Sequence, residues 1–317
     1  MEQPQIRVGV SSCLLGMHVR YDGGHKRDKF ILNTLGKHFE WVHVCPEVEC
    51  GLTTPREAMR LVGDPKQPRL VTSRTGVDHT ERMQRWAEEK LDELEEQQLA
   101  GFIFKAKSPS SGMERIKVYD HNGIPQPVGR GIFASMFMER FPHIPVEDDG
   151  RLHDPDLREN FIERVFVMQR WLDMLKEGKT RGNLVDFHTR HKLLIMAHSV
   201  EEYREMGRLV ASANDYDEDE LFQRYLERLT RAMKTHATSN KNANVLEHML
   251  GYFKDQLSGD EKQEMLEVIE HFKRGDVPLI VPITLFNHYI RKYDEQYLKG
   301  QVYLEPHPVE LKLRNHS

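Results

Sequence analysis

The chain changes character about halfway along its length, and this change constrains the fold more than any other feature. In the first half, short apolar segments at 6–12, 40–44 and 101–104 alternate with longer amphipathic segments. From about residue 151 onward, apolar residues instead recur three or four positions apart. Strands that alternate with helices are typical of a mainly parallel sheet flanked by helices. The sequence therefore predicts an α/β domain over residues 1–150 and an all-α domain over residues 151–317.

Individual helices follow from the same spacing. Residues 79–99 place Met83, Ala87 and Leu91 on one face of a long charged helix. A short strand is expected at 115–119 and an acidic turn at 147–150. The other helices are expected at 28–38, 130–141, 155–178, 183–197, 200–213, 218–235, 243–256, 260–274 and 279–294.

Composition restricts location and partners. The mean hydropathy is -0.63, and no apolar run approaches the roughly 18 residues that a membrane span requires. The N-terminus does not resemble a signal peptide, and three cysteines without an obvious disulfide framework favour a reducing cytoplasm. The formal net charge is -5, so a nucleic-acid partner would need a local basic surface.

All three cysteines lie in the first 50 residues, close to strand ends. Cys13 follows the first predicted strand and Cys45 follows the second, while the loop 108–112 follows the third. In parallel sheets, ligands bind outside the carboxyl ends of the strands. We therefore expect Cys13, Cys45 and the loop to meet at one edge, with the carboxylate of Glu47 between Cys45 and Cys50.

Spacing alone leaves four interpretations of these cysteines open. They can be buried structural thiols, because free cysteine packs as a small hydrophobe. They can bind zinc, with His43 or His25 as a fourth ligand. They can hold an iron–sulfur cluster, which takes soft thiolates. Finally, one thiol can act as a nucleophile beside a histidine.

One predicted helix of the second half carries a basic stripe. Arg224, Arg228, Arg231 and Lys234 recur at helical spacing on one face. Lys and Arg barely outnumber Asp and Glu between residues 179 and 254, so a solvated face with ion pairs competes with an RNA-binding surface. The residues that would extend such a surface are Arg181, Arg190, Lys192 and Lys241, together with Lys179, Tyr252 and Lys254; the pair His188 and His191 is interpreted as structural or RNA-facing.

Linked motifs resemble the thiouracil desulfidase family. They lie at 10–16, 19–23, 45–47, 51–52, 55–57 and 108–112. The segments 191–199 and 244–254 resemble the helical domain fused to it in bacterial tRNA 4-thiouridine desulfidases. The resemblance covers nearly the whole chain.

The resemblance implies a [4Fe-4S] cluster held by Cys13, Cys45 and Cys50, with the fourth iron open to the substrate sulfur. Many stand-alone members have cysteine where this chain has Ser111, and we infer that Cys50 replaces it. The implied reaction hydrolyses 4-thiouridine in tRNA to uridine and hydrogen sulfide.

The chemistry of the neighbouring residues agrees with this reaction, with Glu47 beside the cluster as acid and base. Ser108 and Ser110 would orient the base or the water, and Lys105 would balance negative charge. The alternatives are a desulfidase of free thiouracil or thionucleosides, and a non-catalytic, metal-stabilised RNA-binding protein.

Overall fold

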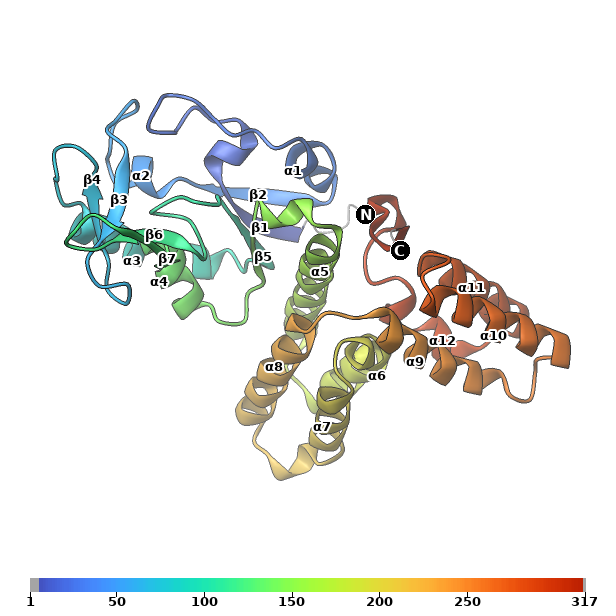
Figure 1. Ribbon diagram of the computed structural model, residues 1–317. Helices are drawn as coiled ribbons and strands as arrows, with labels where there is room; N and C mark the ends of the chain where they lie inside the picture. The colour runs from blue at the N-terminus through green and yellow to red at the C-terminus, as the bar shows by residue number, and fades with distance from the viewer. Residues whose placement is uncertain (1–5, 316–317) are drawn as a thin grey trace. The chain divides into compact units, whose positions relative to one another are not determined.

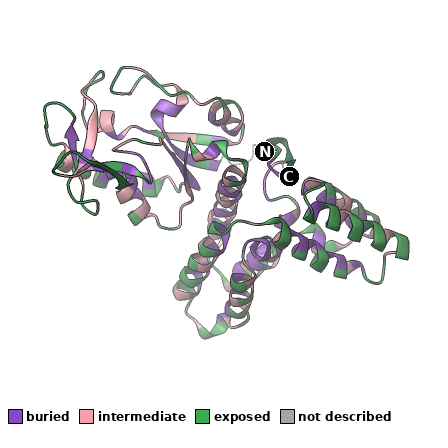
Figure 2. Ribbon diagram, in the orientation of Figure 1, coloured by how far each residue is buried: buried purple, intermediate pink, exposed green. Residues whose placement is uncertain are grey.

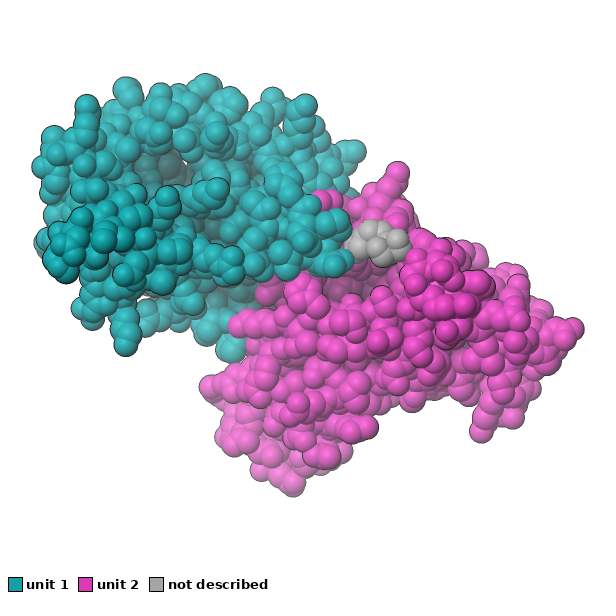
Figure 3. Space-filling view, viewed as in Figure 1, with its two compact units in different colours: residues 1–157 teal, residues 158–317 magenta. Residues whose placement is uncertain are grey.

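The computed structural model describes residues 6–315 and divides into two compact units, Met1–Leu157 and Arg158–Ser317 (Figure 3). Within the described residues, every strand belongs to the first unit, and the second unit is built from helices (Figure 1). This confirms the predicted fold class, an α/β N-terminal part followed by an all-α part.

The first sheet is entirely parallel, as predicted. Its strands lie in the order β2-β1-β5-β8. In the central strand, Val8 and Val10 are completely buried, as expected where helices and turns cover both faces. Gly9 lies between them because a Cβ there would come within 2.1 Å of the Phe102 ring. The strands are β1 (Ile6–Ser11), β2 (Phe39–Val44), β5 (Gly101–Phe104) and β8 (Val146–Asp148).

The predicted acidic turn at 147–150 is wrong in its first half, because Glu147 and Asp148 belong to strand β8. Glu147 and Asp148 are buried, although the sequence pattern placed them on the surface. Arg151 compensates Glu147 through a 2.6 Å ion pair, and its backbone N–H donates to Asp148. Burial raises the pKa of Asp148. Specific partners allow a charged segment to form a buried edge strand, which hydrophobic periodicity cannot predict.

A second, mixed sheet was not predicted. Its strand order is β4-β3-β6-β7, with parallel pairing only between β3 and β6. The predicted strand at 115–119 belongs here. The short strands carry arginines, and β7 contains two prolines, which an edge strand tolerates. The strands are β3 (Met59–Val62), β4 (Arg69–Thr72), β6 (Ile116–Tyr119) and β7 (Pro125–Gly129).

Two helices connect the cores of both sheets. The helices α3 (Thr80–Glu96) and α4 (Ile132–Arg140) pack against Phe102 and Phe104 of the first sheet. Their first turns also pack against the second sheet through Met83 and Ile132. The predicted helix at 28–38 is shorter than expected, because α1 (Lys29–Asn33) is followed by a 3-10 turn.

The helical unit follows the predicted periodicity closely. Most helices present buried residues on one side and exposed residues on the other, while residues 193–198 of α6 are buried all round (Figure 2). Side chains cap many of the N-termini; in α10, Ser258 and Glu261 form a capping box. No helix among the described residues is both long and apolar enough to cross a membrane. The helices are α5 (Pro155–Glu177), α6 (Arg181–His198), α7 (Val200–Ala211), α8 (Glu218–Lys234), α9 (Ser239–Leu250), α10 (Gly259–Lys273), α11 (Ile280–Tyr293) and α12 (Gln296–Lys299).

Candidate active site

A cavity of about 320 Å³ lies at the carboxyl ends of β1, β2 and β5. The expectation that Cys13, Cys45 and the loop 108–112 meet at one edge is therefore confirmed for Cys13, Cys45 and Ser108–Ser111. The lining residues are Ser11, Ser12, Cys13, Val19, Arg20, Tyr21, Lys26, Val44, Cys45, Pro46, Glu47, Arg56, Lys105, Ala106, Lys107, Ser108, Pro109, Ser110 and Ser111.

Both cavity cysteines sit on tight turns that directly follow a strand. Cys13 lies in a 3-10 turn that ends at Gly16, whose φ of +91° suits glycine. Cys45 precedes the single-turn helix α2 (Pro46–Glu49), and Pro46 occupies the first helical position, where no backbone N–H is required. These turns bring both thiols to the cavity wall.

The serine loop is held by the N-terminus of α4. The amides of Ile132 and Phe133 donate to the carbonyls of Pro109 and Ser110, at 3.2 and 3.0 Å. These amides have no partner inside the helix, so the loop satisfies them. A Cβ on Gly131 would lie 2.5 Å from the Ser110 carbonyl carbon, so only glycine allows this close approach.

Glu47 stands at the centre of a hydrogen-bonded chain. Ser110 donates to Glu47 Oε1 at 2.9 Å, and the hydroxyls of Ser108 and Ser110 are 3.0 Å apart. Arg56 Nε donates to the other oxygen, Oε2, at 2.9 Å, and Nη2 of the same guanidinium also contacts it. One carboxylate oxygen is thus bound to a cation, and the other belongs to the serine chain.

Lys105 is not free to balance charge in the cavity, because Asp149 neutralises it. Its Nζ is 2.8 Å from Asp149 Oδ2, and both side chains are largely buried. The Lys105 backbone N–H donates to Ser11 Oγ at 2.9 Å, which connects the ends of β1 and β5. The ammonium still favours the thiolate of Cys13.

Burial keeps the three thiols protonated in the absence of a ligand. It raises the pKa of Cys13 to about 11, against a smaller opposing effect of Lys105. Burial likewise raises the pKa of Cys45 to about 11, and it raises the pKa of Cys50. A metal or cluster would displace these protons on binding.

Cys50 occupies a different position from the other two thiols. It follows α2 directly, its Sγ is 3.4 Å from the Glu47 carbonyl oxygen, and it packs with Leu61 and Met83 of the second core. It is not among the residues that line the cavity, whereas Ser111 is. Its assignment as the third ligand remains a prediction.

The histidines weighed as a fourth zinc ligand lie outside the cavity lining. Among the described residues, His43 is exposed on β2. His25 packs edge-on against His18, with ring centroids 4.9 Å apart. Neither ring supports the zinc interpretation or thiol catalysis through a neighbouring histidine.

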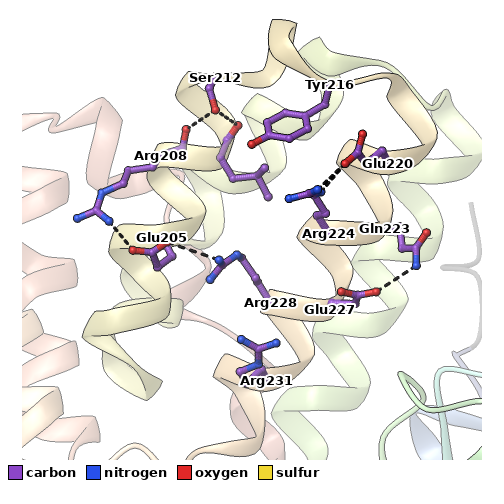
Figure 4. Close-up of a pocket in the computed structure, with 11 residues that line it drawn as sticks. Glu205, Arg208, Ser212, Tyr216, Glu220, Gln223, Arg224, Glu227, Arg228 and Arg231 are labelled. Carbon is purple, nitrogen blue, oxygen red and sulfur yellow. Dashed lines mark hydrogen bonds and ion pairs between the residues drawn. The ribbon is translucent and has the colours of Figure 1, made fainter.

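The basic stripe of α8 borders a groove in the helical unit. This groove, about 520 Å³ in volume, lies between α7 and α8 and is lined by four arginines and three glutamates (Figure 4). Arg224 pairs with Glu220 on the same helix. Arg228 and Arg231 both contact Glu202 of α7, at 3.0 and 3.2 Å.

Several of the remaining predicted RNA-binding residues are also engaged within the protein. Arg181 donates to backbone carbonyls of Ala213 and Tyr216, and Lys241 to those of His198 and His236. Lys192 lies over the ring of Tyr297, Arg190 is 3.9 Å from Asp186, and burial lowers the pKa of Lys234.

His188 and His191 are structural. Both are buried; His188 contacts the hydroxyl of Tyr225, and His191 contacts the carbonyl of Phe187. Burial lowers the pKa of His188 to about 4 and that of His191 to about 3, so both are neutral at pH 7. The suggestion that they face RNA is wrong.

Two functional side chains were missed at the sequence level. Arg56 lies in one of the family-like segments, but no role was assigned to it. Asp149 was taken as part of a surface turn. Both form largely buried ion pairs, Arg56 with Glu47 nine residues earlier and Asp149 with Lys105 44 residues earlier. Neither separation matches a helical or strand repeat, so spacing along the chain gave no signal for either partner.

The fold and cavity together define an α/β protein with a thiol-lined ligand site at the carboxyl edge of a parallel sheet. Sequence comparison specifies the family. Residues 8–149 match the 2-thiouracil desulfurase family, and residues 192–308 match a family described as protein of unknown function (DUF1722). The chain belongs to the thiouracil desulfidase family, with a DUF1722 helical region following the desulfidase region.

Two curated relatives are similar to parts of this chain. The uncharacterized protein YbgA of Escherichia coli (strain K12) is 33% identical over 153 residues, which are 48% of this chain and 90% of that protein. The uncharacterized protein YbbK of Bacillus subtilis (strain 168) is 32% identical over 108 residues, covering 32% and 71% respectively. A solved [4Fe-4S]-dependent thiouracil desulfidase, TudS, shares 31% identity over 47% of this chain and 95% of that chain, with a TM-score of 0.40.

Proposed function

We propose that this protein is an iron–sulfur cluster-dependent desulfidase that converts 4-thiouridine in tRNA to uridine with release of hydrogen sulfide. The observation that carries the proposal is the single cavity in which Cys13, Cys45, Glu47 and Ser110 meet. The family match over residues 8–149 supports desulfuration of a thiolated pyrimidine.

The proposed cofactor is a [4Fe-4S] cluster held by Cys13, Cys45 and Cys50, with one iron open to the substrate sulfur. The donor set fits such a group, because thiolates are the ligands that iron–sulfur clusters prefer. Cys45 and Cys50 flank the same one-turn helix, α2. When bound, the cluster supplies a soft Lewis acid that draws electron density from the thiocarbonyl carbon.

The protein side chains manage water and protons. Water provides the oxygen of the new carbonyl group, the carbon–sulfur bond breaks, and sulfur leaves as hydrogen sulfide without net oxidation or reduction. Glu47 Oε1 would accept the proton of the attacking water and return it to the departing sulfur. The Ser108–Ser110 pair would orient the water or the pyrimidine, while Arg56 holds the far oxygen of Glu47 in place.

Lys105 is proposed to stabilise anionic charge near Cys13 only as part of its pair with Asp149. The pair has no net charge, so its effect depends on the orientation of its dipole. This is a smaller contribution than an unpaired ammonium would make.

The helical unit is proposed to bind the tRNA. Arg224, Arg228 and Arg231 gather at one groove, where guanidinium groups can exchange glutamate partners for phosphates. The wider proposed surface consists of Arg181, Arg190, Lys192, Lys234 and Lys241. A tRNA substrate would place the activity in the cytoplasm, and its thiolated base must unstack to reach the cavity.

Desulfuration of free thiouracil is the second candidate, and a specific observation favours it. The arginines of the α8 stripe already pair with glutamates of their own unit, so the groove carries little unpaired positive charge. The salt dependence of substrate binding distinguishes thiolated tRNA from free thiouracil as the substrate. Binding of tRNA weakens steeply as salt rises, because counterions are released from phosphates, whereas binding of an uncharged base does not.

The decisive experiment is anaerobic reconstitution followed by incubation with thiolated tRNA and, separately, with free 4-thiouracil. Loss of thiouridine absorbance with release of sulfide from tRNA supports the proposal. Activity on the free base alone supports the second candidate.

Glu47→Ala should retain the cluster spectrum and lose turnover, and a variant with full turnover would remove Glu47 from the mechanism. A protein that binds tRNA but never bleaches it would be the non-catalytic RNA-binding alternative.

A further inference from the structure

The loop between Cys13 and α1 places one aromatic side chain at the cavity. Tyr21 is the single aromatic residue among those that line it. Its exposed fraction is 43%, and of the large apolar side chains that residues 6–315 leave exposed, it is the one that borders this cavity. An uncovered ring beside a thiol-lined cavity is available to a ligand.

The backbone beneath this ring is fixed. The Arg56 N–H donates to the Tyr21 carbonyl at 2.8 Å, and the Gly23 N–H donates to the Arg20 carbonyl at 3.0 Å. Gly23 adopts a φ of +77°, which lets the chain reverse, and its carbonyl contacts His18 Nδ1. The tyrosine is therefore held on a closed turn, and the same arginine binds the carboxylate of Glu47.

Arg20 links the tyrosine ring with the thiol end of the cavity. Its guanidinium carbon lies 5.4 Å from the ring centroid of Tyr21. Arg20 and Cys13 line the same cavity as Tyr21. The ring, the guanidinium and the sulfur thus border one space, and Arg20 is itself steadied by Asp22 at 3.5 Å.

We propose that Tyr21 is the stacking platform for the substrate ring, a thiolated pyrimidine base that is either free or unstacked from RNA. Proteins bind unpaired bases by stacking them on aromatic rings, because every base has a π-face. The inference rests on the proposed function and adds the residue that receives the ring. Stacking acts on the bound base rather than on the proton transfers at Glu47, so Tyr21 governs affinity.

The test uses the full-length, anaerobically reconstituted protein and free 4-thiouracil. Turnover is measured in the otherwise wild-type protein, and equilibrium dialysis is carried out with Glu47→Ala present in every variant, so that the base is bound without being converted. Tyr21→Phe keeps the π-face and should bind and turn over like the wild type. Tyr21→Leu keeps an apolar side chain without the π-face. It should weaken binding and raise KM about 10-fold to 100-fold, with kcat changed only a few-fold. Met17→Ala is the control, because Met17 is exposed on the same loop but does not line the cavity.

The outcomes separate the proposed desulfidase function from the proposed stacking role of Tyr21. Binding by Glu47→Ala without turnover by the wild type contradicts the proposed function, and the dialysis of the two Tyr21 variants still tests the platform. If Tyr21→Leu combined with Glu47→Ala binds 4-thiouracil as tightly as Glu47→Ala alone, the platform is rejected even where turnover is normal. Failure of Glu47→Ala to bind 4-thiouracil would reject it as well. Cluster absorbance and melting temperature of each variant show that it is folded and loaded.

Discussion

The ion pair between Arg56 and Glu47 gives the most informative perturbation of this protein. The Arg56 side chain is 7% exposed and that of Glu47 is 15% exposed. The guanidinium makes two contacts to Glu47 Oε2, one to the Val19 carbonyl at 2.9 Å and two to the Thr53–Thr54 segment at 3.1 Å each. Arg56→Ala removes all of these contacts and leaves Glu47 buried without a cation.

Removing one partner of a buried pair costs about 3–5 kcal/mol. Because each kcal/mol lowers the melting temperature of a unit of this size by about 2–4 °C, we expect a fall of about 6–12 °C at the lower end of that cost. Turnover should fall about 100-fold, since Glu47 is no longer held against the serine chain. Differential scanning calorimetry and 4-thiouracil turnover measure the two effects.

Arg74→Ala is the matched control. Arg74 also faces a glutamate, Glu57, but its side chain is 86% exposed and the atoms are 3.9 Å apart. Its loss should change stability by no more than about 0.5 kcal/mol. The reasoning is refuted if Arg56→Ala melts like the control and retains wild-type turnover, because the pair would then neither stabilise the unit nor position the carboxylate.

Three further predictions concern other parts of the chain. Cys50→Ala should abolish cluster loading, as measured by iron and sulfide content; full loading would assign the third ligand elsewhere. Arg228→Glu combined with Arg231→Glu should weaken tRNA binding in a filter assay and spare turnover of 4-thiouracil, and parallel losses would make the stripe a folding feature. The pKa of His191, lowered to about 3 by burial, predicts that stability decreases as pH falls from about 6.5, where the unfolded chain becomes protonated, toward 3. His191→Phe should flatten the pH dependence of the melting temperature between pH 6.5 and 4, and an unchanged slope would rule out this imidazole as its source.

Periodicity predicted the elements whose burial pattern is regular. The helix α3 was found because Met83, Ala87 and Leu91 repeat every four residues, and β1 because apolar residues run continuously through it. The strands β3, β4, β7 and β8 were missed, because they are short and carry charged or proline residues. The ion pair of Glu147 with Arg151, four residues further along the chain, stabilises a buried charged strand that local propensity disfavours.

The amino-acid sequence by itself determined the succession of an α/β half and a helical half, the parallel pairing of the first sheet and the strand ends at which Cys13 and Cys45 lie. It did so because strand and helix periods are local, and parallel strands place their carboxyl ends on one edge. Only the tertiary structure decided that Arg56 binds Glu47, that Asp149 neutralises Lys105 and that Tyr21 borders the cavity. Each of these contacts joins segments that only the fold brings together. Contacts between separate segments produce no periodic pattern along the chain, so periodicity cannot predict them.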